Sequence, residues 1–231
     1  MKPRNFRRYC LPLITSAACL LFNGALHAQY VEVGDAGSSA ATAQGTGNVA
    51  GQALTTIAGT ISATADADFY LITIASPSLF SATTVGRSLV DTQLYLFTLN
   101  GAPVYLNDDA NGASTQSSLP AGSLLGPQTA GTYILGISVS GVDPVNSSNQ
   151  SLFAPAFFST DVRGPASNTF GTVAGVIDNA SFADFGAYSI ALTGAATALA
   201  VPEPATGALL AAGAFVVGAA ARRRRRAVAA S

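Results

Sequence analysis

Gly131-Thr-Tyr-Ile-Leu-Gly-Ile-Ser-Val-Ser-Gly141 is the stretch of sequence that decides the fold. Its bulky side chains recur at every second position, at Tyr133, Leu135, Ile137 and Val139. The residues between them include the small or polar Thr132, Gly136 and Ser138. Because successive side chains of a β-strand point to opposite faces, this alternation predicts a strand with one buried face.

A second stretch, Gly186 to Gly194, repeats the pattern, with a Gly-x-Tyr start and then alternating aliphatic residues at Tyr188, Ile190 and Leu192. Further alternating segments between turn residues lie at Leu54–Ile61, Asp68–Ile74, Leu79–Val85, Thr92–Thr98, Pro103–Leu106 and Thr172–Ile177. About eight short strands predict an all-β fold, an antiparallel two-sheet sandwich of jelly-roll type, over residues 54–198.

Two segments outside these strands are rich in turn residues. Gly34 to Gly51 is small and polar, which predicts that residues 29–53 form a flexible lead-in to the sandwich. Asp143 to Gly171 is a long connection that contains several phenylalanines, and such a connection is a binding loop, a disordered excursion or a missed strand. Its phenylalanines are expected either to tuck under the sandwich or to form an exposed interaction site.

The chain begins like a secretory signal peptide over residues 1–28. Four basic residues precede an apolar run from Leu11 to Phe22, and the small residue Ala28 follows. This order predicts export and cleavage by signal peptidase after Ala28, which leaves Gln29 as the new N-terminus. A lipoprotein signal at Cys19 is the alternative.

The chain ends with three features in a fixed order. An apolar stretch at 205–221 is preceded by Pro202, Glu203 and Pro204 and is followed by Arg222, Arg223, Arg224, Arg225 and Arg226. At 1.5 Å per helical residue the apolar stretch spans roughly 25 Å, the short end of a transmembrane helix. The arginines are expected to stop this helix on the cytoplasmic side. A permanent membrane anchor explains the helix and the arginines, but it does not explain the prolines.

This succession resembles the PEP-CTERM sorting signal of Gram-negative bacteria, here over residues 199–231. The resemblance implies that Pro202, Glu203 and Pro204 are recognised by an exosortase, a membrane-embedded cysteine protease of organisms that export polysaccharide. It also implies a route for the chain. The protein crosses the inner membrane, is held there transiently by its tail, and then reaches the cell surface or the exterior, associated with exopolysaccharide.

Without the two ends, the chain is strongly acidic. Between Gln29 and Glu203 only Arg87 and Arg163 are basic, against twelve Asp and Glu residues, so the formal charge of this part is −10. The same part contains no Cys, His, Lys, Trp or Met. Its composition therefore excludes disulfides, imidazole or thiolate metal sites, and Ser-His-Asp or Cys-His catalysis. Nucleic acid is not expected as a partner, because little positive charge is present to neutralise phosphates.

Acidic clusters lie at the ends of three predicted strands: Asp66 and Asp68 in DADFYLITI, Asp91 in VDTQLYLF, and Asn107, Asp108, Asp109 and Asn111 in LNDDANG. Followed by a Ser-rich link and the AGTYILGISV strand, this succession resembles the bacterial pre-peptidase C-terminal domain, over about Ile61 to Ser140. The resemblance implies a sandwich that accompanies secreted enzymes or surface proteins and has no catalytic role of its own.

Asp91, Asp108, Asp109 and Asn111 are candidate ligands of a calcium ion. Ca²⁺ takes 6–8 oxygen ligands, and Asp109-x-Asn111-Gly112 matches part of a calcium-loop pattern. The same residue types also form ordinary hairpin turns, so turn formation alone is the competing explanation. No other cofactor is implied.

These observations predict a non-enzymatic exported protein of the cell surface or extracellular matrix. A calcium-dependent carbohydrate-binding module is the first alternative. A carboxylate-dependent hydrolase is the second, and the sequence offers it little support. The adjacent Asp108 and Asp109 are expected to point apart, and no apolar pocket is evident that would raise the pKa of one carboxyl group.

Overall fold

The alternating stretch that decides the fold forms β9, Gly131–Val139, which lies in the middle of the larger of two sheets. The computed structural model describes residues 27–156, 158–168, 170–180 and 184–200. β9 pairs antiparallel with β4 (Ala67–Ile74) on one side and with β6 (Thr92–Thr98) on the other. The segment is thus a strand, as its alternation predicts, and it lies at the centre of its sheet.

Six strands form this larger sheet, in the order β13-β4-β9-β6-β7 with β2 also paired to β4. The three strands that complete it are β2 (Gln44–Gly45), β7 (Pro103–Asn107) and β13 (Ala195–Thr197). Five strands form the other sheet, in the order β1-β3-β12-β5-β8. They are β1 (Ala28–Val31), β3 (Leu54–Ile61), β5 (Ser81–Thr83), β8 (Ser118–Leu119) and β12 (Gly186–Thr193).

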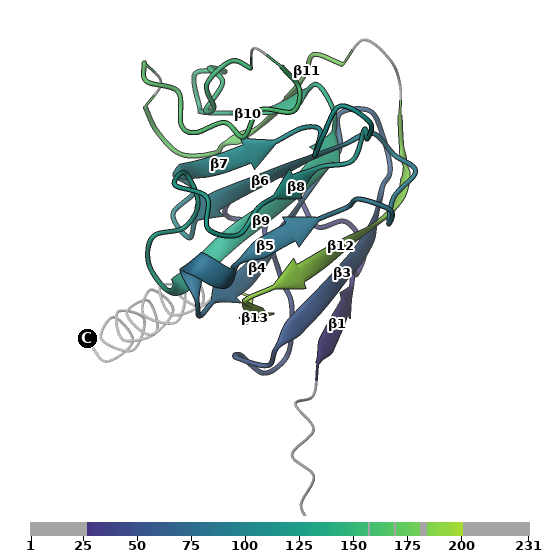
Figure 1. The fold of residues 1–231 in the computed structure, drawn as a ribbon, viewed down its shortest axis with the longest axis vertical. Helices are drawn as coiled ribbons and strands as arrows, with labels where there is room; N and C mark the ends of the chain where they lie inside the picture. Colours follow the sequence, from purple (N-terminus) through teal and green to yellow (C-terminus); the bar gives the residue numbers. More distant parts are fainter. Residues whose placement is uncertain (1–26, 157, 169, 181–183, 201–231) are drawn as a thin grey trace, which may run out of the picture.

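Two smaller elements complete the fold. β10 (Val142–Val145) and β11 (Gly175–Asp178) pair with each other beyond β7, at the upper end of the view in Figure 1. A short 3-10 helix, η1 (Pro77–Leu79), precedes β5, so the strand predicted from Leu79 is shorter than expected at both ends.

The space between the two sheets is filled by apolar side chains from both. The five-stranded sheet contributes Leu54, Ile57, Ile61, Tyr188 and Ile190, and the six-stranded sheet contributes Tyr70, Ile72, Leu94, Leu96, Leu135 and Ile137. Each such side chain stabilises the fold by about 1.5–3 kcal/mol when it leaves water completely. The predicted two-sheet sandwich is therefore confirmed.

The outer face of the six-stranded sheet is buried as well, which the alternation does not predict. Phe69, Tyr95, Phe97 and Ile134 lie on this face, in one cluster with Leu152, Phe153 and Val173. Phe153 comes from the long connection Asp143–Gly171, and its ring stacks on Tyr95 at a centroid distance of 6.3 Å. The connection therefore covers the sheet, although its Phe158 and Phe170 remain exposed.

Gly136 of β9 provides the space for the aromatic rings on this outer face. A Cβ atom at this position would lie 2.8 Å from the ring of Phe69 and 2.9 Å from that of Tyr95. These two residues are opposite Gly136 on the neighbouring strands β4 and β6. Glycine in the middle of this strand thus lets two large rings pack closely over the sheet.

The predicted flexible lead-in is wrong for residues 29–53, because this segment folds onto both sheets. β1 pairs in parallel with β3, and β2 pairs in parallel with β4, so the sandwich is not purely antiparallel. The side chains of Ala36 and Thr46 are buried, and the Thr46 hydroxyl donates a hydrogen bond to the Leu71 carbonyl at 2.7 Å.

Candidate functional site

The structure brings three of the four predicted calcium ligands together. Asp91 directly precedes β6, and Asp108 and Asp109 directly follow β7. β6 and β7 are antiparallel neighbours, and Leu94 near the start of β6 pairs with Asn107 at the end of β7. One carboxylate oxygen from each of the three aspartates lies within 4.8 Å of the others. The expectation that Asp108 and Asp109 point apart is therefore wrong.

Asn107 holds the turn that carries this cluster. Its side chain is buried, its Oδ1 accepts a hydrogen bond from the Ser118 amide at 2.8 Å, and its Nδ2 donates to the Asp109 carbonyl at 3.0 Å. Asn111 lies in an exposed turn, where its Oδ1 accepts a hydrogen bond from the Ala113 amide at 3.0 Å. Asn111 thus acts as a turn residue here, and its role as a ligand stays a prediction.

The electrostatics of the hairpin cluster (Asp91, Asp108 and Asp109) favour a neutralising group. Burial, and then the charges of the other two members and of Asp184, raise the pKa of Asp91 to about 6. Burial also raises the pKa of Asp108, although a side-chain hydrogen bond with Ser140 and then the charge of Arg163 act in the opposite direction. One oxygen of Asp91 and one of Asp108 are buried and have no hydrogen-bond partner among the described residues. Two carboxylate oxygens are therefore available to a cation.

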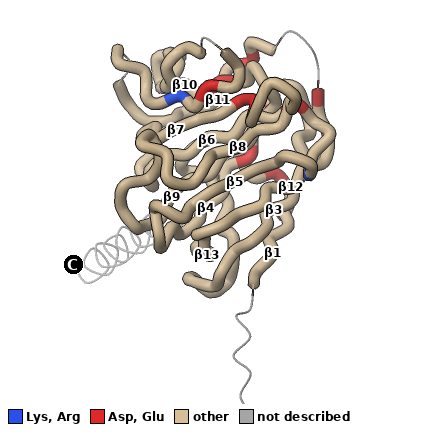
Figure 2. Tube along the Cα trace, in the orientation of Figure 1, with Lys and Arg blue, Asp and Glu red and all other residues tan. Residues whose placement is uncertain are grey.

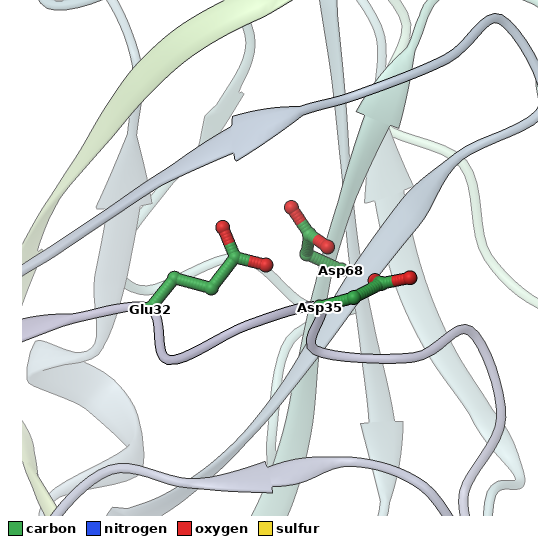
Figure 3. Close-up of side chains that lie close together, drawn as sticks. All are labelled: Glu32, Asp35 and Asp68. Atoms are coloured by element: carbon green, nitrogen blue, oxygen red, sulfur yellow. The ribbon is translucent and has the colours of Figure 1, made fainter.

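A second acidic cluster, made of Glu32, Asp35 and Asp68, was not found from the sequence. Glu32 and Asp35 follow β1, and Asp68 lies in β4. Figure 3 shows their carboxylates around one space, and one oxygen from each lies within 4.8 Å of the others. Glu32 and Asp35 lie in the segment that is predicted to be flexible. No local sequence signal could have found the cluster, because its members meet only through the pairing of β1 with β3.

Asp68 is the buried member of this second cluster, with an exposed fraction of 0%. Its Oδ2 accepts a hydrogen bond from the Tyr188 hydroxyl at 2.7 Å. Burial, and then the charges of Glu32 and Asp66, raise the pKa of Asp68 to about 8, against the lowering effect of the Tyr188 hydrogen bond. The expectation that no apolar pocket raises a carboxyl pKa is thus wrong. The same burial keeps Asp68 out of reach of a polymeric substrate.

The predicted processing sites lie at the margins of the described residues. Ala28 and Gln29 are the first two residues of β1. The sorting residues Pro202, Glu203 and Pro204, the apolar stretch 205–221 and the arginines 222–226 lie outside the described residues. Among the residues that the structure does describe, no helix is long and apolar enough to cross a membrane.

Comparison with known families identifies the C-terminal segment. Residues 200–226 match the family model of the PEP-CTERM protein-sorting motif, and these residues include the Pro-Glu-Pro tripeptide and the arginine cluster. No curated protein matches the chain, and the resemblance of the central part to the pre-peptidase C-terminal domain is not confirmed. The chain therefore carries a PEP-CTERM sorting signal and is an exported, cell-surface protein that this signal directs to an exosortase.

Proposed function

We propose that the protein is a non-enzymatic component of the cell surface or of the exopolysaccharide matrix, released into it when an exosortase removes the sorting signal. The observation that carries this proposal is the match of residues 200–226, which start three residues after the last strand, β13. The signal is thus attached directly to the sandwich. Before processing, the tail holds the sandwich at the inner membrane.

The charge distribution supports a role outside the membrane. Acidic residues gather in the upper part of the view in Figure 2, whereas the lower part, where β1 begins and β13 lies, is almost without charge. The acidic part of the domain is thus turned away from the strand that leads into the sorting signal. An anionic exterior of this kind favours solubility and disfavours non-specific contact with anionic polymers.

The proposal of no enzymatic activity rests on the chemistry of the available groups. The exported part contains no Cys, His or Lys, so no side-chain imidazole, thiolate or amine is present to activate its Ser, Thr or Tyr hydroxyls, and carboxylates are the main candidates for acid–base work. Glycoside hydrolysis needs two carboxyl groups about 5–10 Å apart on either side of an accessible sugar. The carboxylate with the most strongly raised pKa, Asp68, has no solvent-exposed surface on which a sugar could bind.

The proposed processing is tested on protein recovered from cells. Mass spectrometry of its C-terminus is expected to find the chain cut near Pro202–Pro204. A variant with Pro202 and Pro204 both replaced by alanine is expected to keep the tail. A mature wild-type protein that still ends in Ser231 contradicts the proposed processing. Turnover of glycans or peptides by the wild type, lost on Asp109→Asn, contradicts the absence of catalysis.

A calcium-dependent carbohydrate-binding function is the second candidate, and the convergence of Asp91, Asp108 and Asp109 favours it. In this function, calcium bound by the hairpin cluster orders the turn that contacts a glycan. Isothermal titration of the protein with exopolysaccharide, with and without CaCl₂, tests this function. A heat of binding that is seen only with CaCl₂ and is lost in Asp109→Asn supports this function. No heat of binding either with or without CaCl₂ rejects it.

A further inference from the structure

The second acidic cluster joins two parts of the chain that are distant in sequence and belong to different sheets. Glu32 and Asp35 extend from β1 of the five-stranded sheet, and Asp68 belongs to β4 of the six-stranded sheet. The three carboxylates face one space (Figure 3). The nearby charges that act on Asp68, those of Glu32 and Asp66, are both negative. The protein therefore gathers three acidic side chains here, with no positive charge among the described residues acting on Asp68.

Asp68 provides independent evidence for a missing partner. It has an exposed fraction of 0%, and its Oδ1 makes no hydrogen bond to any described residue. Its other oxygen is already bound by the Tyr188 hydroxyl. Buried polar atoms almost always have a partner, because an unsatisfied one retains the full cost of leaving water. Asp68 thus brings to the acidic cluster an oxygen, Oδ1, that is an unused ligand atom.

Two backbone amides hold the Glu32 carboxylate in position beside Asp68 and Asp35. Its Oε1 accepts a hydrogen bond from the Ala36 amide at 3.1 Å, and its Oε2 accepts one from the Thr60 amide at 2.9 Å. Gly59 of β3 makes room for this arrangement, because a Cβ atom there would lie 2.6 Å from Oε2 and would overlap the Tyr188 hydroxyl. The carboxylate is therefore fixed before any ligand binds, and each of its oxygens keeps a lone pair.

We propose that Glu32, Asp35 and Asp68 bind a divalent cation, Ca²⁺, which ties the segment after β1 to strand β4. The donor atoms are all hard carboxylate oxygens, which suit Ca²⁺, whereas zinc and copper prefer imidazole or thiolate. Water completes the 6–8 oxygen ligands on the side of Asp35, which is exposed. The bound ion removes the repulsion within the cluster and gives Asp68 Oδ1 its partner. This site is separate from the hairpin cluster and does not depend on the proposed matrix function.

The test uses the full-length chain in detergent at pH 7.5, titrated with CaCl₂ after treatment with a chelator. The thermal unfolding midpoint of the wild type is expected to rise by about 5–10 °C at a calcium concentration 100 times Kd. Asp35→Asn, a change at an exposed residue, is expected to weaken calcium binding by more than about tenfold in calorimetry. The same change is expected to leave the midpoint of the calcium-free protein nearly unchanged, because Asp35 is exposed.

Two further variants locate the ion. Asp68→Asn is expected to abolish the response to calcium, and Asp109→Asn, in the hairpin cluster, is expected to leave it intact. Tb³⁺, a stand-in for Ca²⁺, luminesces when a nearby tyrosine transfers energy to it, and Tyr188 is hydrogen-bonded to Asp68. This luminescence should therefore be lost in Asp68→Asn and kept in Asp109→Asn. No response of the wild type at about 10 mM CaCl₂, which exceeds the range of extracellular calcium modules, overturns the proposal. A response that Asp109→Asn removes and Asp35→Asn keeps also overturns it, because the ion then lies in the hairpin.

Discussion

Replacement of Phe153 by alanine tests whether the long connection Asp143–Gly171 is part of the folded core. The Phe153 side chain is only 4% exposed, and its ring packs on Tyr95 and Phe97 with centroid distances of 6.3 and 5.5 Å. Burial of one phenylalanine stabilises a protein by about 1.5–3 kcal/mol, and each aromatic pair adds about 0.5–1.5 kcal/mol. The sum agrees with the cost of about 3–5 kcal/mol typical of Phe→Ala changes in cores.

Because the connection lies on the outer face of the sheet and can partly collapse into the vacated space, we expect a loss near 3 kcal/mol. Urea unfolding measures this loss, and thermal unfolding should show a midpoint lower by about 6–12 °C. Phe158→Ala is the matched control in the same connection, since its side chain is 71% exposed, and it should change stability by less than about 0.5 kcal/mol. Equal stability of the two variants would refute the conclusion that the connection covers the sheet.

Three further changes test the fold and its electrostatics. Asn107→Ala should cost about 1–3 kcal/mol in urea unfolding, because it removes a buried side chain and leaves partly buried backbone groups of the hairpin turn without partners; a loss below about 0.5 kcal/mol would mean that other contacts are enough to stabilise the turn. In calcium-free buffer, the free energy of unfolding should fall as the pH rises from about 4 to about 8. Burial raises the pKa of Asp68 to about 8, so the folded state keeps a proton that the unfolded state has lost. Asp68→Asn should remove the part of this slope above about pH 6, where Asp91 contributes little, and an unchanged slope there would assign it to other groups. Gly136→Ala should cost about 1–3 kcal/mol, because the new Cβ atom meets the rings of Phe69 and Tyr95; a wild-type melting point would show that both rings move aside easily.

The strands with regular alternation could be predicted closely from the sequence. Leu54–Ile61 and Thr92–Thr98 are strands with the predicted bounds, and the stretch around Leu135 forms the central strand β9. The reason is that a strand with at least one buried face must place an apolar side chain at every second position. The hairpin cluster could also be predicted from the sequence, because Asp91 and Asp108 flank two strands that are adjacent both in sequence and in the sheet.

The parts that were missed depend on contacts between segments far apart in the chain. β1 and β2 pair in parallel with strands distant in sequence, and their short, mostly small or polar residues carry no alternation. The meeting of Glu32 with Asp68 follows from this pairing, so no local pattern indicates it. Burial of the outer face of β9 likewise depends on the connection Asp143–Gly171. Some phenylalanines of this connection are buried and others are exposed, and their sequence does not distinguish them.

The folded sandwich fills almost the whole interval between the two predicted processing sites. β13 ends at Thr197, five residues before Pro202, and five extended residues reach at most about 17 Å. An exosortase that recognises Pro202 must therefore act within that distance of the six-stranded sheet. At the other end, cleavage after Ala28 leaves Gln29 to Val31 paired with Thr56 to Ala58 of β3. The predicted cut after Ala28 removes one paired residue of β1, and the predicted cut near Pro202 lies beyond β13, so the predicted processing would leave every described strand of the fold in place.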